Sequence, residues 1–495
     1  MRNDNNKRGG IEEALPDGLD RRRFVQGAGT GLVAVTAGCF GGSDGGGGNG
    51  DDGGGTDSGN GSDGGYEVDQ IHILMDYANE AWQDRWEKVL IPGFEDETGV
   101  SVNIEYVGFQ GTSEQRLQTL MQSGDYPNSY QGSTSETADI ISAGNAIPVT
   151  DVNQDLTETN GEFAWDPSLI TFGDEQWFVP HLTYTAGTVS YRTDVFDDLG
   201  LEPAETWDEL LSNAEAIDAD SNTEARGYNV GGTKAGQASS EFRTYLRCAG
   251  GGLFRRRSDS QEEVEVWFDE DRALETLEFM QQLAQYSPDP SQTTWTASLK
   301  YWAAGRVAQC WHLNAWTAGI ADNAGVSSIA RNTDITPTPV KADADPIDRG
   351  FTSPDGATLL DTDGAEATKD FFRYIYGTIE RTVENLLMEP MRSAPPYEGL
   401  IENETYRNAD VHQKYDGHLY ELNRKNVEEV LPELSSPDRP ATPATRFVLR
   451  FPILAEMVNR VLIVDDPPKA AYDEALSRLE DRLQEGKEKA AVQFG

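Results

Sequence analysis

Cysteine is scarce in this chain, with three among 495 residues: Cys39, Cys248 and Cys310. The sequence therefore lacks the C-x-x-C spacing of thiol redox enzymes and of cysteine zinc sites. It also contains no G-x-S-x-G, H-E-x-x-H or Walker motif. Cys248 and Cys310 leave two alternatives open: a disulfide, which an oxidising exterior permits, or two separately buried thiols.

Basic residues are few, 40 against 85 acidic ones, so the formal net charge is −45. Residues 1–38 hold six basic and five acidic residues, which leaves 34 basic and 80 acidic residues and a charge of −46 on the rest. This charge excludes a nucleic-acid partner. Self-repulsion destabilises a compact state unless molar salt shortens the Debye length to about 3 Å. We therefore predict a halophilic, archaeon-like source; the alternative is a mesophilic protein that binds cations or basic partners.

Long hydrophobic runs are also missing. The weakly apolar residues 27–37 are far fewer than the roughly 20 residues that span a bilayer. They follow Arg21, Arg22 and Phe24, in the order of a twin-arginine export signal, and precede small residues and Cys39, in the order of a lipobox. The order predicts that residues 1–38 are a twin-arginine-type lipoprotein signal peptide and that Cys39 is lipidated after cleavage. A buried amphipathic helix is the alternative.

The next segment is almost entirely Gly, Asp, Ser and Asn. Such a composition buries too little apolar surface to offset the entropy of ordering. We therefore predict that residues 39–65 are the lipidated cysteine and a flexible linker, with a reach of roughly 25–30 Å. About 430 residues remain for two domains.

Hydrophobic periodicity predicts strands alternating with helices after residue 66. Ile71, Ile73 and Met75 alternate as in a strand, and the stretch from Val100 to Tyr106 does the same. Between them, apolar residues recur at helical offsets: Trp82, Trp86, Val89, Leu90 and Phe94. We expect Pro92 to bend or end that helix. This order is typical of a parallel sheet covered by helices.

The same rhythm recurs in the second half of the chain. A strand is predicted at residues 188–191, and Thr206 with Glu209 forms the pattern of a capping box at a helix start. Further helices are predicted at residues 272–283, at residues 368–379 and after Asp466.

Short motifs follow one another along residues 66–495. They read FEDETGV at 94–100, LMQSGDYP at 120–127, GNAIPV at 144–149, VSYRTDVF at 189–196, GLEP at 200–203, TWDEL at 206–210 and GRVA at 305–308. In this order the chain resembles the extracellular solute-binding proteins of ABC transporters, in the branch that binds sugars. Asn128 stands where that family usually has Asp, and Arg192 where it usually has Asn.

The resemblance implies an α/β, two-lobe periplasmic-binding-protein-like fold. Each lobe would be a mostly parallel sheet flanked by helices, with the ligand cleft between the lobes. One lobe would comprise residues 66–185 and 356–425, and the other residues 186–355 and 426–495. The chain is expected to cross between lobes near residues 182–188, near 351–359 and within 390–431. Closure of such lobes around a ligand is a known hinge motion.

Candidate ligand-binding residues follow from the rule that ligands lie beyond the carboxyl ends of strands. They are polar or aromatic residues of the predicted loops, crossings and second lobe: Tyr77, Asn79, Gln110, Ser133, Thr134, Glu136, His181, Tyr184, Asn229, Trp311, Asn314, Trp316, Phe351, Asp355 and Arg392. Sugars need such hydroxyl, amide and carboxylate groups together with aromatic faces. Most tryptophans are core residues, but Trp316 occupies the position where the family stacks a ring. His181 has the alternative of being an ordinary polar loop residue.

Three other sequence patterns suggest functional sites, but we interpret none of them as a metal-binding or ligand-binding site. Asp151, Asn153, Asp155 and Glu162 match a calcium loop, but Leu156 stands where that loop needs glycine. His412 and His418 are six apart, a poor zinc spacing. The basic run 255–257 is expected to pair with nearby glutamates; contact with an acidic permease surface is the alternative. We predict no metal and no cofactor.

The leading hypothesis is a lipid-anchored receptor on the extracellular face of the membrane. It would capture a sugar or oligosaccharide by lobe closure and deliver it to an ABC permease, without catalysing a reaction. One alternative keeps the fold and changes the solute to a polyol phosphate or a polyamine. Another is a secreted glycoside hydrolase, which needs two carboxylates flanking the scissile bond.

Overall fold

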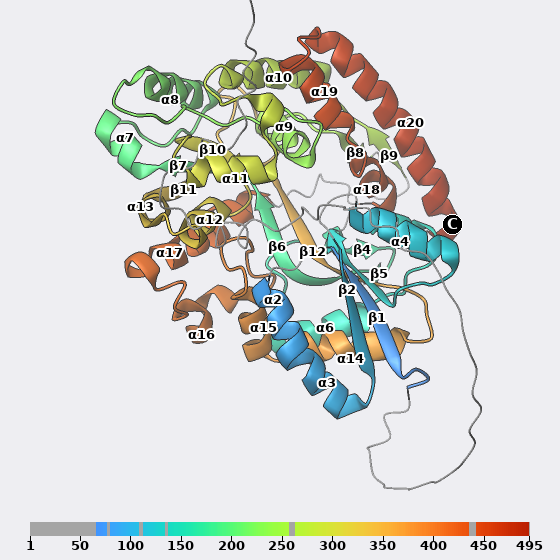
Figure 1. Ribbon diagram of the computed structural model, residues 1–495. Coiled ribbons are helices and arrows are strands. Elements are labelled where there is room, and N and C mark those ends of the chain that lie inside the picture. Colours follow the sequence, from blue (N-terminus) through green and yellow to red (C-terminus); the bar gives the residue numbers. More distant parts are fainter. Residues whose placement is uncertain are drawn as a thin grey trace, which may run out of the picture.

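A computed structural model describes residues 66–76, 80–107, 112–133, 137–256, 263–434 and 442–494 (Figure 1). The predicted export signal with Arg21, Arg22 and Phe24, and the predicted lipidation site Cys39, lie outside these residues. None of the described helices is both long enough and apolar enough to cross a membrane.

The first lobe is built on a five-stranded sheet in the order β2-β1-β3-β12-β6. Its strands are β1 (Gln70–Met75), β2 (Ser101–Tyr106), β3 (Ser129–Ser133), β6 (Val179–Ala186) and β12 (Phe351–Leu359). β1 pairs in parallel with β2 and β3, as the order of strands and helices predicted. β12 runs antiparallel to β3 and β6, so the parallel part of the sheet ends there.

The first helical segment continues through Pro92, where we expected it to bend or end. It consists of α2 (Glu80–Arg85), a π-helical stretch over Trp86–Leu90, and α3 (Ile91–Thr98). The N–H of Ile91 bonds to the carbonyl of Trp86, five residues back, and this wider turn leads into the proline. The widening also rotates Val89 outward: it is 54% exposed, so its predicted place on the apolar face was wrong.

The other helices of the first lobe pack around the same sheet. They are α4 (Thr112–Ser123), α5 (Ala138–Ser142), α6 (Thr150–Asn160), α14 (Ala365–Tyr376), α15 (Ile379–Leu386) and α16 (Glu404–Arg407). Trp86 and Phe94 meet the ring of Phe371 on α14 edge-on, with centroid distances of 5.8 and 5.2 Å. Rings from the two ends of the lobe's sequence therefore share one core.

The second lobe is built on a smaller, antiparallel sheet. β7 (Thr188–Arg192) lies between β10 (Gln309–His312) and β11 (Thr333–Pro337) and is antiparallel to both. The expectation of a mostly parallel sheet was wrong for this lobe. Parallel pairing near this sheet is limited to isolated bridges, such as those of Thr206 with Val340 and of Arg226 with Val307.

Helices surround this second sheet. They are α7 (Thr193–Leu199), α8 (Trp207–Ala219), α9 (Gly236–Cys248), α10 (Glu270–Ala284), α11 (Trp295–Ala303), α12 (Trp316–Asn323), α13 (Ser327–Arg331), α17 (His418–Lys425), α18 (Pro443–Leu449), α19 (Ile453–Leu462) and α20 (Pro468–Phe494). The predicted capping box is confirmed: Thr206 caps α8 and the Glu209 side chain returns to its backbone N–H. Two short strand pairs complete the fold, β4 (Thr171–Phe172) with β5 (Glu175–Gln176) and β8 (Phe254–Arg256) with β9 (Val264–Val266).

Two long strands connect the lobes, and they run through the middle of the molecule in Figure 1. β6 belongs to the first sheet and continues through Gly187 into β7 of the second. β12 begins at Phe351 in the core of the second lobe and ends at Leu359 in the core of the first. Away from these strands, α18 and α20 pack against α5 of the first lobe.

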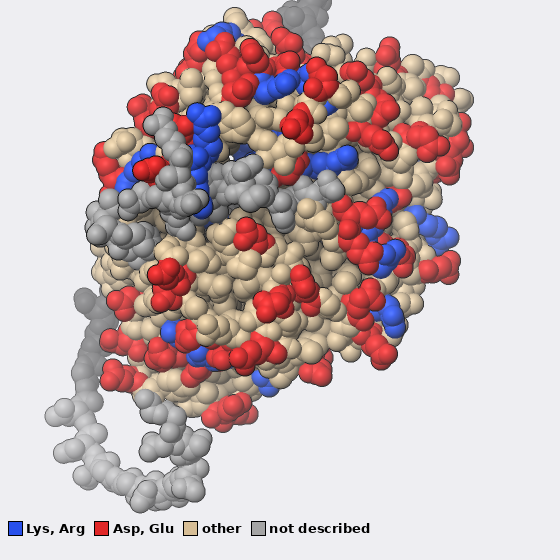
Figure 2. Space-filling model, turned by 180° about the vertical axis from the view of Figure 1, so that it is seen from behind, with Lys and Arg blue, Asp and Glu red and all other residues tan. Residues whose placement is uncertain are grey.

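The remaining sequence patterns have structural explanations. Cys248 and Cys310 are both buried and unpaired, so of the two alternatives the separately buried thiols are confirmed. The calcium-like pattern begins on helix α6, where Asp151 and Asp155 form ion pairs with Arg373. Arg255 pairs with Glu265 across the β8–β9 hairpin. Acidic side chains are spread over both lobes in Figure 2.

Candidate functional site

The β6–β12 strand pair brings several predicted residues onto one face. Alternate residues of a strand share a face, so Phe351 and Asp355 of β12 point to the same side. Tyr184 of β6 pairs with Ser353, which lies between them, and so joins that face. Ser133, the last residue of β3, lies directly opposite Asp355 in the sheet.

Arg392 joins this face to the second lobe. Its guanidinium lies over the ring of Tyr184 and over the ring of Trp316, 5.2 Å from each centroid. Its Nη1 donates to Oε2 of Glu389 at 2.7 Å, and only 3% of the side chain is exposed. Trp316 is partly exposed and is the first residue of α12. Arg392, Tyr184, Trp316 and Asp355 are called the boundary cluster below, because they link elements of both lobes.

Burial and neighbouring charges shift the pKa values of two groups in the boundary cluster. Burial raises the pKa of the Asp355 carboxyl, and the positive charge of Arg392 opposes that increase. Burial also raises the pKa of the Tyr184 hydroxyl well above its usual value. The carboxylates of Asp355, Glu389 and Asp76 reinforce that second increase. Tyr184 therefore stays protonated and able to donate a hydrogen bond at any physiological pH.

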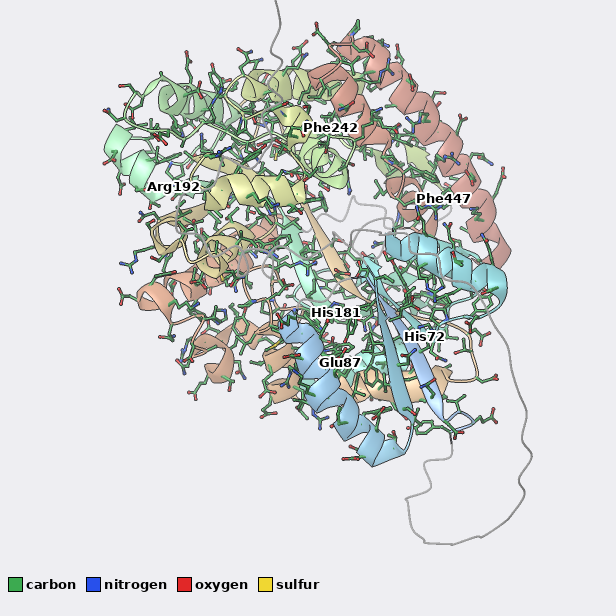
Figure 3. All side chains as sticks on the ribbon, in the orientation of Figure 1. His72, Glu87, His181, Arg192, Phe242 and Phe447 are labelled. Carbon is green, nitrogen blue, oxygen red and sulfur yellow. The ribbon has the colours of Figure 1, made fainter. Side chains whose placement is uncertain are left out.

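His181 lies on β6 between the two lobes (Figure 3). Its ring meets Trp82 edge-on at 5.4 Å and stacks on Tyr376 at 6.4 Å. Burial, reinforced by Arg392, lowers the pKa of His181 to about 3, so the ring is neutral at physiological pH. Its Nδ1 is buried and has no hydrogen-bond partner among the described residues. The strand position contradicts the alternative of a polar loop residue, and the unpaired nitrogen leaves a polar group for a ligand.

The tryptophans of the second lobe divide into core and boundary residues. Trp302 is fully buried, and its Nε1 donates to Oγ1 of Thr333 at 3.1 Å. Trp311 is also fully buried, with its ring 5.6 Å from that of Trp295. His312 sits edge-on to Trp316, 5.5 Å away. Of the predicted tryptophans, Trp316 alone keeps part of its ring accessible within the described structure.

Two predicted asparagines are engaged by the protein itself. The Oδ1 of Asn314 accepts a bond from the Thr185 backbone N–H at 2.8 Å, and its Nδ2 donates to the carbonyl of Arg392. Asn314 thereby ties the first crossing to the segment that carries Arg392. Asn229 is fully buried and donates from Nδ2 to Oγ of Ser298 at 2.6 Å. The amide of Asn314 is thus bound to the backbone of the boundary cluster, and that of Asn229 to the core of the second lobe.

The remaining predicted residues fall into two groups. Phe351 lies beneath the guanidinium of Arg243 at 4.2 Å, away from Arg392. The others lie outside the described residues: Tyr77, Asn79, Gln110, Thr134 and Glu136.

The sequence analysis missed two carboxylates that act on the boundary cluster. Asp76 is buried and directly follows β1, where the strand-end rule could have found it. Glu389 lies three residues before Arg392, a spacing typical of an ion pair within one turn. The described residues hold no group of three or more His, Cys, Asp or Glu side chains arranged to bind a metal ion.

Comparison with known proteins supplies the family. A model described as "Bacterial extracellular solute-binding protein" matches residues 76–379, more than half of the chain. The chain belongs to this family. It is therefore a binding protein of the cell exterior rather than an enzyme. No curated protein sequence matches it.

Solved structures with the same fold include an ABC transporter solute-binding protein from Thermotoga lettingae TMO bound with alpha-D-tagatose. It has a TM-score of 0.65 and 21% identity, covering 84% of this chain and 99% of that one. The GacH receptor of Streptomyces glaucescens, solved unliganded and with acarbose, has a TM-score of 0.66 and 16% identity, with coverages of 84% and 99%. Maltose-bound MalE3 of T. maritima has a TM-score of 0.66 and 16% identity, with coverages of 83% and 99%. The two-lobe fold predicted from the sequence is thus confirmed.

Proposed function

We propose that this protein is the substrate-binding component of an ABC importer that captures a sugar or oligosaccharide between its two lobes. The observation that carries the proposal is the boundary cluster, in which a partly exposed tryptophan and a buried arginine meet residues of both lobes. Family membership and the sugar ligands of structures that share the fold support it.

The chemistry of the cluster suits a sugar. The guanidinium of Arg392 and the hydroxyl of Tyr184 can donate to hydroxyl oxygens, while the carboxylate of Asp355 can accept from hydroxyl groups. The ring of Trp316 offers a flat apolar surface to the C–H face of a pyranose.

Lobe closure would use the two connecting strands. β6–β7 and β12 cross between the lobes within a few residues of Tyr184 and Phe351, so a small change in backbone angles there moves one lobe against the other. A ligand that contacts both Asp355 and Trp316 would favour the closed state, because only that state offers both contacts.

We also propose that Cys39 carries a lipid, that residues 1–38 are the export signal, and that the linker lets the bound solute reach the permease. The extracellular nature of the family supports this placement. Replacing Cys39 with Ser should release the protein into the medium of its host. Retention in the membrane fraction would contradict the anchor.

A thermal-shift screen of the purified protein in molar KCl tests the proposed function. A ligand that binds only the folded state at a hundredfold excess over Kd stabilises it by about 2.7 kcal/mol. We expect stabilisation by at least one sugar, which should be recovered intact. No shift with any sugar, but one with a different solute, would contradict the sugar assignment.

A further inference from the structure

A β-bulge in β6 gives His181 a position of its own on the first sheet. Asp355 and Gly356 are consecutive on β12, but their partners on β6 are two residues apart, so His181 is the extra residue between them. A Cβ at Gly356 would collide with the carbonyl oxygen of Val179, so the bulge requires glycine opposite it. Bulges of this kind re-aim a side chain and are frequent next to functional sites.

The re-aimed His181 ring lies against two aromatic side chains of the first lobe (Figure 3). It meets Trp82 of α2 edge-on and lies nearly parallel to Tyr376 of α14, with an angle of 8° between the ring planes. Both aromatic residues belong to the same buried core as Met75 and Ala357. His181 therefore points to the face of the sheet that α2 and α14 cover.

Gln131 lies on the same face, on the other side of β12. It pairs with Met75 of β1 and with Ala357 of β12, both of which belong to that core. Asp355 is two residues from Ala357 and is therefore the diagonal neighbour of Gln131, about 7–8 Å away. Asp355 thus has Gln131 on one side and the bulge with His181 on the other. A ligand group bound at Asp355 is within reach of both.

The polar ends of Gln131, His181 and Tyr376 have no hydrogen-bond partner among the described residues. These ends are both amide atoms of Gln131, Nδ1 of His181 and the hydroxyl of Tyr376. The side chains are 1%, 9% and 1% exposed, and buried polar groups are normally paired because an unpaired one is costly. All three are neutral at physiological pH, since burial lowers the pKa of His181 to about 3 and raises that of Tyr376 well above its usual value.

We propose that Gln131, His181 and Tyr376 form a hydroxyl-binding subsite of the first lobe, beside Asp355, which selects the solute by the hydroxyl groups of a neutral sugar. This inference rests on the proposed function and deepens it. An amide and a phenol both donate and accept, and a neutral imidazole adds a further donor or acceptor, so the three groups suit neighbouring hydroxyls. A sugar that lacks one of these hydroxyls leaves a buried group unpaired in the complex and is discriminated against strongly.

The first test uses the ligand-free protein. Tyr376→Phe and Gln131→Met remove unpaired polar atoms and nearly keep the shape of the side chain, so each should leave Tm unchanged or raise it. Tyr406→Phe is the matched control: this tyrosine is also fully buried, but its hydroxyl accepts from Nδ2 of Asn423 at 2.9 Å, so its loss should lower Tm. Decreases in Tm for the first two variants as large as that of Tyr406→Phe would overturn the proposal, because their polar groups would already be satisfied.

The second test is calorimetric titration of the full-length protein at constant molar KCl. The probes are glucose, galactose, mannose, maltose and their single-deoxy forms. Tyr376→Phe and Gln131→Met should each weaken binding of the parent sugar about tenfold or more, while Tyr406→Phe should leave its affinity unchanged. At least one deoxy form should bind the wild type about tenfold or more weakly than its parent, and this difference should largely disappear in the variant that lost the matching group.

The outcomes separate this inference from the proposed function. A sugar that binds the wild type, Tyr376→Phe and Gln131→Met equally well, with no deoxy form weakened, would overturn the hydroxyl-binding subsite and leave a sugar receptor. Failure of every sugar to bind would overturn the proposed function, and the subsite with it.

Discussion

At the residue scale, we expect substitution of Trp316 to affect sugar binding and substitution of Trp302 to affect stability. Trp316→Ala should weaken sugar binding about tenfold or more, because it removes an aromatic face and the support of Arg392. Trp302→Ala should instead lower the free energy of unfolding by about 3–5 kcal/mol, because it empties a fully buried site. Calorimetry and denaturant unfolding measure the two effects. Unchanged affinity in Trp316→Ala would remove this ring from the site.

The buried carboxyl of Glu241 makes a second residue-scale prediction, on pH dependence. Glu241 is fully buried; its oxygens accept from Gly231 N–H at 2.9 Å and from the Tyr228 hydroxyl at 3.2 Å. Burial raises the pKa of Glu241 to about 8, although both hydrogen bonds oppose the increase. The folded state therefore holds a proton that the unfolded state has released, and this group's stabilisation is lost as pH rises from about 4.5 to 8.

The matched variant is Glu241→Gln, which keeps the shape of the side chain and cannot ionise. Its free energy of unfolding should fall less than that of the wild type between pH 5 and about 8. Glu366→Gln, at a side chain that is 77% exposed, is the control and should follow the wild type. Parallel pH profiles for wild type and Glu241→Gln would mean that Glu241 does not titrate in this window.

At the element scale, Asn314 stabilises the segment near residues 182–188, where β6 crosses from the first lobe to the second. This residue has a φ of 45°, and its side chain bonds to Thr185 and to the carbonyl of Arg392. Asn314→Ala should lower the free energy of unfolding by about 2–4 kcal/mol, because it leaves buried polar groups unpaired and places alanine at a positive φ. Asn314→Gly relieves the backbone cost only, so the difference between the variants, measured by urea unfolding, isolates that cost. Wild-type stability in both would show that the crossing does not need this side chain.

The elements also show how far sequence reasoning reached. Alternation in β2 and the capping box at Thr206 are local signals, and both predictions were confirmed. Val89 was placed wrongly because a π-helical turn shifts the period of the helix, which no spacing rule registers. The second sheet was wrong in direction because strand pairing is set by tertiary contacts rather than by the order of elements.

The site could be predicted only in part, because the sequence shows the chemistry of a side chain but not its tertiary contacts. Tyr184, Asp355, Trp316 and Arg392 carry polar or aromatic groups at predicted crossings, and the fold brings them together. Asn314 has the same kind of polar side chain, yet its amide oxygen accepts a hydrogen bond from the backbone N–H of Thr185, where the chain crosses between the lobes.

At the scale of the whole molecule, the charge of −45 predicts a strong dependence on salt. Exposed carboxylates repel one another over a Debye length of about 10 Å at 0.1 M salt and about 3 Å at 1 M. Tm should therefore rise by several degrees between 0.1 M and molar KCl, with most of the gain at the lower concentrations, where screening changes fastest. A Tm that is independent of KCl would contradict the predicted saline habitat.

The central claim is that a sugar binds between the lobes, and a crystal structure of the protein with the sugar that stabilises it tests this most directly. The account predicts one sugar in contact with Trp316, with hydroxyl groups on Arg392 and Asp355. A sugar held elsewhere, such as the depression between α10 and α19 lined by Gln281 and Asp465, with the boundary cluster untouched, would contradict it.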